Sequence, residues 1–398
     1  MNKSVPILPA TAILAAIAIF VLLVAPQGAR AQAGYDFSSG YAYLPDGYNK
    51  LSSDRVGISA TRVPRGGTTA GISPVSGPEP VPTEGDFFPP SGQNASWQFI
   101  GDYLYIRPSN AEVAYAQVVD AGSGLPIGRT GVANPYHDIG FRVSGARALG
   151  DGASLGVSYA YFDTTVATST LASDNPQLLV PPDSQVRSLV FHPAAPNAGI
   201  LGDTAIARQT VRFQMGDVDY KAAMVSGPRY CANLLVGARF LDLDQRFESS
   251  ITDGSGFSEL MYADVRFEGG GVRFGVEGER QSPSSGFLVY GKGTMSFVAG
   301  TVRARFSEFN ELSPFVVDGF GRFNRLLSML DFELGAGWTN VDGTIRVTGG
   351  WMMSGWYNTV KPSNLIRAVQ TTTPGILDSP PENVLAFDGL VFRVELRF

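Results

Sequence analysis

The sequence predicts an all-β protein, a transmembrane antiparallel β-barrel of about ten strands, with twelve strands as the alternative. Three observations lead to this fold class. From Trp97 onward, apolar and polar residues alternate over strand-length segments, as in strands with two different faces. The connections between these segments are alternately short and long. The composition, with 47 Gly and 26 Pro in 398 residues, disfavours long helices and suits strands joined by turns.

The first 33 residues have the features of a cleaved export signal. Lys3 provides a positive charge ahead of an apolar run from about Ala10 to Ala25, and Ala29-Arg30-Ala31 or Ala31-Gln32-Ala33 provides a cleavage site. An uncleaved anchor helix is the alternative, but the run is shorter than the ~20 residues of a bilayer-spanning helix. We therefore expect an exported protein that enters a membrane, if it does, through strands.

Residues 34–95 are rich in Gly, Pro, Ser and Thr, as in "GISPVSGPEPVPTEGDFFPPSG". Because such a segment buries little apolar surface, we expect it to be a flexible linker. Ordered structure is expected to begin near Trp97, so the predicted barrel covers residues 96–398.

Ten segments show the alternation, and most reach the ~9–11 residues of a tilted membrane strand. In chain order they are residues 97–107, 137–149, 153–165, 208–224, 230–248, 262–281, 286–306, 323–339, 343–358 and 385–398. The clearest apolar faces are Ile139, Phe141 and Val143; Val272, Phe274 and Val276; Phe287, Val289, Met295 and Phe297; Leu330, Phe332, Leu334, Ala336 and Trp338; and Ile345, Val347, Trp351 and Met353. The opposite faces carry charges of both signs, which a packed core would not accept, so we expect them to be wet.

The connections are sorted by length. "GDG" (150–152), "SGPR" (226–229), "SPSS" (282–285) and "NVDG" (340–343) are tight turns, whereas the intervening connections, about 108–136, 166–207, 249–261, 307–322 and 359–384, are long. Outer-membrane barrels have short periplasmic turns and longer outer loops, and a soluble sandwich has no reason for this sorting. A soluble exported β-sandwich remains the alternative.

The alternation is interrupted in two segments. In 230–248 the parity slips near Leu241, and in 286–306 it slips near Arg303. A barrel that extends beyond the bilayer on its outer side explains both slips, and β-bulges would explain them equally well.

The last segment, "FDGLVFRVELRF", alternates up to its final phenylalanine. A terminal phenylalanine on such a strand is typical of barrels that the outer-membrane assembly machinery recognises. The residues assigned to this signal are Phe392, Val394, Leu396 and Phe398.

The charged faces supply the candidate pore lining. It consists of Arg142, Arg212, Arg273, Glu277, Lys292, Asp331, Glu333, Arg346, Arg393, Glu395 and Arg397. Their signs nearly balance, so the sequence does not indicate cation or anion selectivity. A ten-stranded barrel is narrow, and these side chains either line a thin channel or pair and fill the lumen.

Little in the sequence points to catalysis or to a cofactor. There are two histidines and one cysteine, Cys231, which we expect to be an inert thiol. His137 and His192 are expected at the barrel rim or in loops. "DVDYK" (217–221) and "DLDQRFE" (242–248) each place two carboxylates on one face; calcium at an outer loop is one interpretation, and solvated carboxylates near the rim are the preferred one. Tryptophans and tyrosines near strand ends predict an aromatic girdle.

An ordered series of segments also resembles a known family. They are "YLYIRP" (103–108), "AEVAYA" (111–116), "LLVGARFLDLDQRFES" (234–249), "FGVEGER" (274–280), "GFLVYGKGTMSFVAGTVRARF" (286–306), "FELGAGW" (332–338), "GWMMSGWYNTV" (350–360) and "FDGLVFRVELRF" (387–398). Over about 97–398 the chain resembles the Legionella major outer membrane protein family, in a branch typical of planctomycetes. The resemblance implies a pore-forming barrel and supplies no catalytic residues.

Two functions remain open. The first is a porin-like channel for passive diffusion of ions or small solutes through the outer membrane. The second is a closed structural or adhesive barrel whose long loops bind an external partner. Both have outer-membrane lipid and the assembly machinery as partners; nucleic acid is not expected, because no basic stripe is present and the net charge is −6. A lipid-acting enzyme that uses the histidines is disfavoured.

Overall fold

The computed structural model describes residues 97–150, 152–164, 167–173, 184–195, 200–227, 229–256, 258–282, 284–310, 317–341, 343–371 and 383–398. The expected export signal (1–33) and linker (34–95) lie outside these residues.

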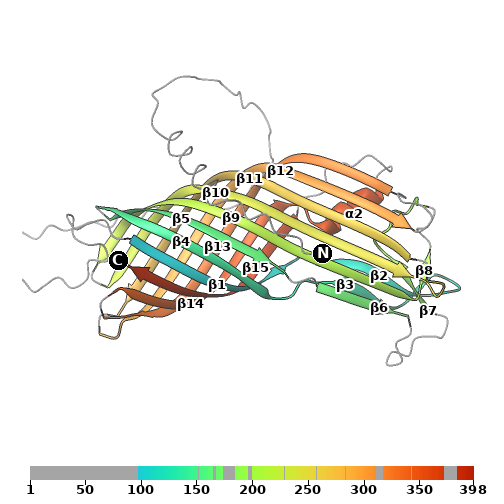
Figure 1. Ribbon diagram of the computed structural model, residues 1–398, viewed down its shortest axis with the longest axis horizontal. Helices are drawn as coiled ribbons and strands as arrows, with labels where there is room; N and C mark the ends of the chain where they lie inside the picture. Colours follow the sequence, from blue (N-terminus) through green and yellow to red (C-terminus); the bar gives the residue numbers. More distant parts are fainter. Residues whose placement is uncertain are drawn as a thin grey trace, which may run out of the picture. The chain divides into compact units, whose positions relative to one another are not determined.

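Ten antiparallel strands close into a ring, as the sequence predicts (Figure 1). They are β1 (Trp97–Ser109), β4 (Asp138–Gly150), β5 (Ala153–Asp163), β9 (Thr204–Gly227), β10 (Tyr230–Thr252), β11 (Ser258–Gln281), β12 (Phe287–Asn310), β13 (Val317–Thr339), β14 (Ile345–Thr359) and β15 (Asn383–Arg397). Around the ring the order is β1-β4-β5-β9-β10-β11-β12-β13-β14-β15, and β15 pairs with β1. The fold is therefore an all-β barrel.

Closure and the tight turns define one end of the barrel. Trp97 and Phe398 exchange two backbone hydrogen bonds of 3.0 and 2.9 Å. Gly152, Gly286 and Gly343 have φ of +73°, +69° and +70°, which residues other than glycine rarely adopt, so glycine permits these turns. We call this the short-turn end and the opposite one the long-loop end.

At the long-loop end, two connections are much shorter than the sequence predicts. β10 runs to Thr252 and β11 begins at Ser258, so most of the predicted loop 249–261 is strand. Likewise, β12 runs to Asn310 and β13 begins at Val317 within the predicted loop 307–322. The reason is visible in the burial pattern of β10, β11 and β13, where inward and outward positions keep alternating up to these strand ends.

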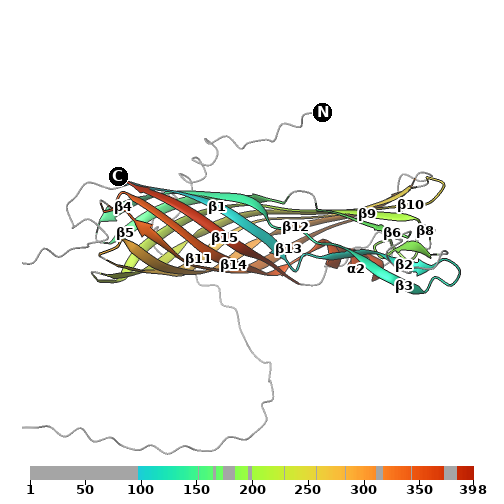
Figure 2. The ribbon, with the colours of Figure 1, turned by 90° about the horizontal axis from the view of Figure 1, so that it is seen from below.

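The other long connections contain structure of their own. β2 (Val113–Asp120), β3 (Pro126–Ala133), β7 (Ser184–Ser188) and β8 (Leu201–Gly202) form a four-stranded sheet in the order β3-β2-β7-β8. β6 (Ala167–Ala172) extends the barrel sheet beside β9, and α2 (Pro362–Thr371) follows β14. All of these lie at the end opposite the C-terminus, below the long strands β9 and β10 in Figure 2.

This outer layer covers the inner faces of the long strands. Buried Gln209 on β9 donates to the carbonyl oxygen of Ala111 at 2.6 Å, and buried Gln245 on β10 donates to that of Val360 at 2.8 Å. Lys361 donates to the carbonyl oxygen of Asn110 at 2.6 Å, and burial lowers the pKa of its ammonium. Among the described residues, no helix has both the length and the apolar character needed to cross a membrane.

The outer face of the barrel changes character along each long strand. On β10, Phe240 is 49% exposed, and the next outward residues are Asp242 and Asp244. On β12, outward Phe297 gives way to Arg303. Neither change coincides with a shift in strand register, so the two apparent slips reflect a barrel that continues beyond the apolar band rather than bulges.

The inner face changes in the opposite sense. On β10, inward Arg239 is followed by Leu241 and Leu243, both buried, and on β12 inward Ser296 is followed by Val298 and Val302. The half nearer the short turns is therefore apolar outside and polar inside, as lipid contact requires. The half nearer the long loops has an apolar core and a charged exterior, as a water-exposed protein does.

The tryptophans follow this division. Trp97 and Trp338, at the short-turn end, are each 48% exposed, and Trp351 lies on the outer face between the strand ends at 51%. These positions fit lipid contact and an interfacial aromatic belt. Trp356 is the exception, because it faces inward and is 1% exposed.

Candidate functional site

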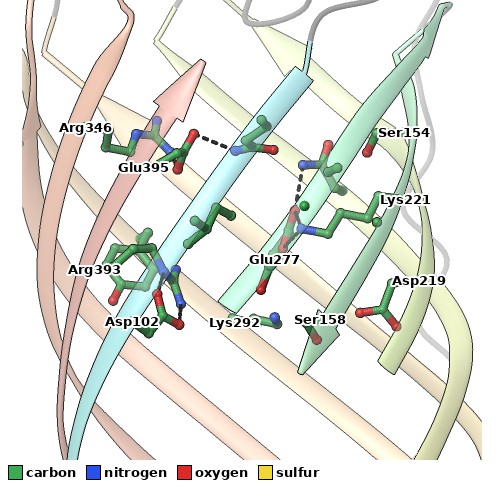
Figure 3. A pocket seen from close by; sticks show the side chains of 18 of the residues that line it. Asp102, Ser154, Ser158, Asp219, Lys221, Glu277, Lys292, Arg346, Arg393 and Glu395 are labelled. Atoms are coloured by element: carbon green, nitrogen blue, oxygen red, sulfur yellow. Dashed lines mark hydrogen bonds and ion pairs between the residues drawn. The ribbon is translucent and has the colours of Figure 1, made fainter. Parts of the chain in front are cut away.

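The polar half of the barrel encloses a cavity of about 230 Å³ (Figure 3). Its wall comes from the inward positions of the ring strands, from Gln98 and Arg397 near the short-turn end to Asp217 and Arg273 deeper inside. Because side chains alternate along a strand, every second residue of each strand contributes. We refer to this space as the cavity.

The candidate pore-lining residues are placed inside the barrel, with one exception. The inward ones are Arg142, Arg273, Glu277, Lys292, Asp331, Glu333, Arg346, Arg393, Glu395 and Arg397. Arg212 lies on the outer face, since its neighbours Val211 and Phe213 are buried in the interior at 0% and 4% exposed. Its ion pair with Asp163, at 3.9 Å, is likewise partly exposed. The prediction misplaced Arg212 because it did not fix the parity of this strand.

One ionic cluster crosses the barrel. Arg142 on β4 is 2.5 Å from Asp102 and 2.9 Å from Glu333 on β13, which lies four strands away around the ring. Arg393 donates to the same two carboxylates, both at 2.8 Å. Tyr290 donates to Glu333 at 3.0 Å. Two opposite walls of the barrel are thus joined by charged hydrogen bonds.

A second cluster is more deeply buried. Arg239, 1% exposed, donates to both oxygens of Asp217 at 2.8 and 3.0 Å and to Asp331 at 2.7 Å. Arg273 donates to Asp217 at 2.8 Å and to Asp219 at 2.5 Å. Each arginine therefore holds two carboxylates, which compensates for part of the cost of burying these charges.

The remaining charges lie closer to the mouth of the cavity. Arg346 forms a two-pronged pair with Glu279 at 2.8 and 2.9 Å, and Arg397 contacts Glu395 at 2.5 Å. Lys221 contacts both oxygens of Glu277 at 2.9 Å. Figure 3 shows Lys221 beside Glu277, and Arg346 beside Glu395 on another part of the wall.

Sequence reasoning missed six members of this network. The missed partners are Asp102, Asp217, Asp219, Lys221, Arg239 and Glu279. Asp217 and Asp219 had been noticed as an Asp-x-Asp pair but were interpreted as solvated rim carboxylates; they are instead 4% and 7% exposed and bound by arginines. Arg239 could have been found from the sequence, because it lies two and four positions before Leu241 and Leu243. All three side chains therefore lie on the same face of β10, which is the inner one.

Above the ionic clusters, four aromatic side chains form a layer across the lumen. Phe213 on β9 and Trp356 on β14 have ring centroids 5.3 Å apart, although their strands lie five positions apart in the ten-strand ring. Phe387 contacts both, at 5.1 and 4.7 Å, and Phe162 is 6.0 Å from Phe387. We call these four residues the aromatic layer. Side chains from opposite walls are therefore in direct contact at this level.

Beyond the aromatic layer the interior stays filled. The same core cluster continues toward the long-loop end through residues exposed by 5% or less, among them Val211, Leu243, Phe247 and Phe306. Leu365 of α2 belongs to it as well. The described residues thus form a cavity at the short-turn side and a solid core at the other.

The candidates for other chemistry are separated in space. His137 stacks on Tyr105 with a centroid distance of 5.2 Å, whereas His192 is buried among the outer elements and its backbone amide donates to Glu308. Asp242 and Asp244 are on the outer surface, paired with Arg266 and Arg246. Within the described part of the chain, no three His, Cys, Asp or Glu side chains are grouped to hold a metal ion.

Comparison with known proteins gives one family. The family model described as "Legionella pneumophila major outer membrane protein precursor" matches residues 90–398. The outer membrane protease OmpT from Escherichia coli is 12% identical, with a TM-score of 0.40, over 76% of this chain and 96% of that one. A FadL homologue from Pseudomonas aeruginosa is 8% identical, with a TM-score of 0.23, over 76% and 90%. None of the curated proteins matches.

Proposed function

This chain belongs to the Legionella pneumophila major outer membrane protein family, and on that premise we propose that it is a closed barrel that anchors a folded β-unit at the cell surface. The protein is located in the outer membrane. Short turns of such barrels face the periplasm, so the cavity opens to the periplasm and the charged outer half projects outward. We assign no catalytic step to it.

The aromatic layer is the observation that carries this proposal. A passive channel needs a continuous water path, but Phe213 and Trp356 meet across the full width of the ring. The core that follows is packed to the long-loop end, so small side-chain movements would not connect the cavity to the exterior.

The outer half has the features of a surface for contact. It has two layers, the long barrel strands and the sheet β3-β2-β7-β8 with α2, around its own hydrophobic core. Leu125 and Phe320 are 64% and 65% exposed on it. Exposed large apolar groups beside charged residues suit binding of another macromolecule.

A porin-like channel for small ions or solutes is the second candidate function. The cavity favours it, because a barrel that serves only as an anchor has no need of an ion-lined space. Such a channel would have to open the aromatic layer and the packing beyond it.

Single-channel recording in planar bilayers separates the two. We expect the refolded wild-type protein to insert, as checked by heat-modifiable gel migration, and to give no conductance steps. The variant Phe213→Ala/Trp356→Ala should also be silent, because the core beyond the layer remains. Discrete steps from the wild type would overturn the closed barrel, and steps from the variant alone would favour a gated channel. Trp351→Ala, on the lipid face, is the matched control.

A further inference from the structure

Lys292 is the exception among the charges inside the barrel. It lies on β12 and lines both the cavity and the small space next to the aromatic layer. Every other inward lysine or arginine described above has a carboxylate oxygen within 3 Å. Across the described residues, Lys292 has no hydrogen bond and no carboxylate within 4 Å, and its ammonium is directed into the cavity (Figure 3).

Its neighbours across the sheet make this isolation unexpected. Lys292 stands opposite Glu277 on β11 and opposite Glu333 on β13. Glu277 is held by Lys221 and by Asn233. Glu333 is held by two arginines and by a tyrosine. Both carboxylates opposite Lys292 in the sheet are therefore hydrogen-bonded to other groups.

The charged groups in and next to the cavity balance in number, but one of them has no direct partner. Seven cationic residues line it: Arg142, Lys221, Arg273, Lys292, Arg346, Arg393 and Arg397. Six carboxylates line it: Asp102, Asp217, Asp219, Glu277, Glu279 and Glu395. Asp331, Glu333 and Arg239 line the adjoining space and bring the totals to eight positive and eight negative groups. Lys292 is the cation among them that no carboxylate contacts directly.

The facing wall offers neutral donors. Ser144 on β4 and Ser158 on β5 line the cavity, and neither hydroxyl has a partner among the described residues. β4 lies five positions from β12 around the ten-strand ring in either direction, so it forms the opposite wall. An object between the walls can therefore meet an ammonium on one side and hydroxyl groups on the other.

We propose that the cavity binds a small monovalent anion, such as a halide or a short carboxylate, on Lys292. A partly desolvated ammonium without a hydrogen-bonded partner is costly, and an anion that enters from the open mouth of the cavity supplies that partner. A cation would find no uncommitted carboxylate there. The site holds its anion at a dead end in the closed barrel, so the proposal does not depend on conduction.

Crystals of the intact protein grown in bromide test this directly. We expect an anomalous peak beside the Lys292 ammonium in the wild type, its loss in Lys292→Gln, and its retention in Lys292→Arg. Arg397→Gln is the control, because it removes one positive charge from the same cavity at its mouth and should keep the peak. A wild-type cavity without bromide, or a peak that survives in Lys292→Gln, would overturn the proposal.

Thermal unfolding in detergent gives an independent readout. A ligand that binds the folded state raises the unfolding temperature with concentration. At constant ionic strength, exchange of a bulky organic anion for bromide should raise the unfolding temperature of the wild type and of Arg397→Gln, and this rise should vanish in Lys292→Gln. An equal rise in all three proteins would mean that bromide acts elsewhere and would sink the site.

Discussion

Replacing Arg239 by methionine should destabilise the barrel more than any exchange of a surface charge. Arg239 is 1% exposed and holds Asp217 and Asp331 through three hydrogen bonds of 2.7–3.0 Å. Methionine fills similar space beside Met329 but leaves two carboxylates less compensated. Asp217 still accepts a hydrogen bond from Arg273 at 2.8 Å, so Asp331 is the carboxylate that loses its arginine partner. Removal of one partner from a buried pair typically costs about 3–5 kcal/mol, and we expect a value in this range.

Denaturant unfolding of the protein refolded into lipid vesicles measures this cost. Tryptophan fluorescence reports the midpoint, and an unchanged slope allows midpoints to be converted into free energies. Arg266→Met is the control, since Arg266 is 48% exposed and its pairs with Asp242 and Glu268 should contribute at most about 1 kcal/mol. Adding Asp331→Asn to Arg239→Met should recover part of the loss, because it removes the uncompensated charge. The reasoning fails if Arg239→Met costs no more than the control.

Two further substitutions test the two halves of the barrel and the tight packing inside it. Leu334→Arg, on the outer face of β13 within the apolar band, should lower the free energy of unfolding by about 2–4 kcal/mol. Phe320→Arg, on the same face of the same strand beyond the band, should lower it by under about 1 kcal/mol. Equal costs in vesicle unfolding would place the band elsewhere. Gly237→Ala should cost about 1–3 kcal/mol, because its Cβ would collide with the carboxylate of Asp219, and Gly349→Ala, with open space around it, should be neutral in the same assay.

The strands could be predicted from the sequence because apolar and polar residues alternate along each strand according to the face on which they lie. The alternation of Phe392 and Val394 with Arg393 and Glu395 is local information, and the same holds for every ring strand. The ends at the long-loop side were harder. There the alternation persists, but the outward residues become polar and the inward residues become apolar. Asp242 therefore resembles a shift in strand register, although it lies on the same outer face as Phe240, where water replaces lipid.

Pairing across the lumen could not be predicted in this way. Which residues meet inside a barrel depends on strand number, tilt and stagger together, and no single strand encodes these. Thus Arg142 and Glu333 were both candidates, but nothing in either strand indicated that they would lie 2.9 Å apart. The contact of Phe213 with Trp356 could not be predicted for the same reason.

The position of the cavity follows from the inversion of the two faces. Where lipid covers the outside, the inward side chains are long and charged, they form ion pairs, and the cavity lies among them. Where water covers the outside, the inward side chains are apolar and close up. The aromatic layer stands at the junction, where Asp331 and Met329 are successive inward residues of β13. The ion-lined cavity on one side and the apolar core on the other are therefore two consequences of a single barrel that passes from lipid into water.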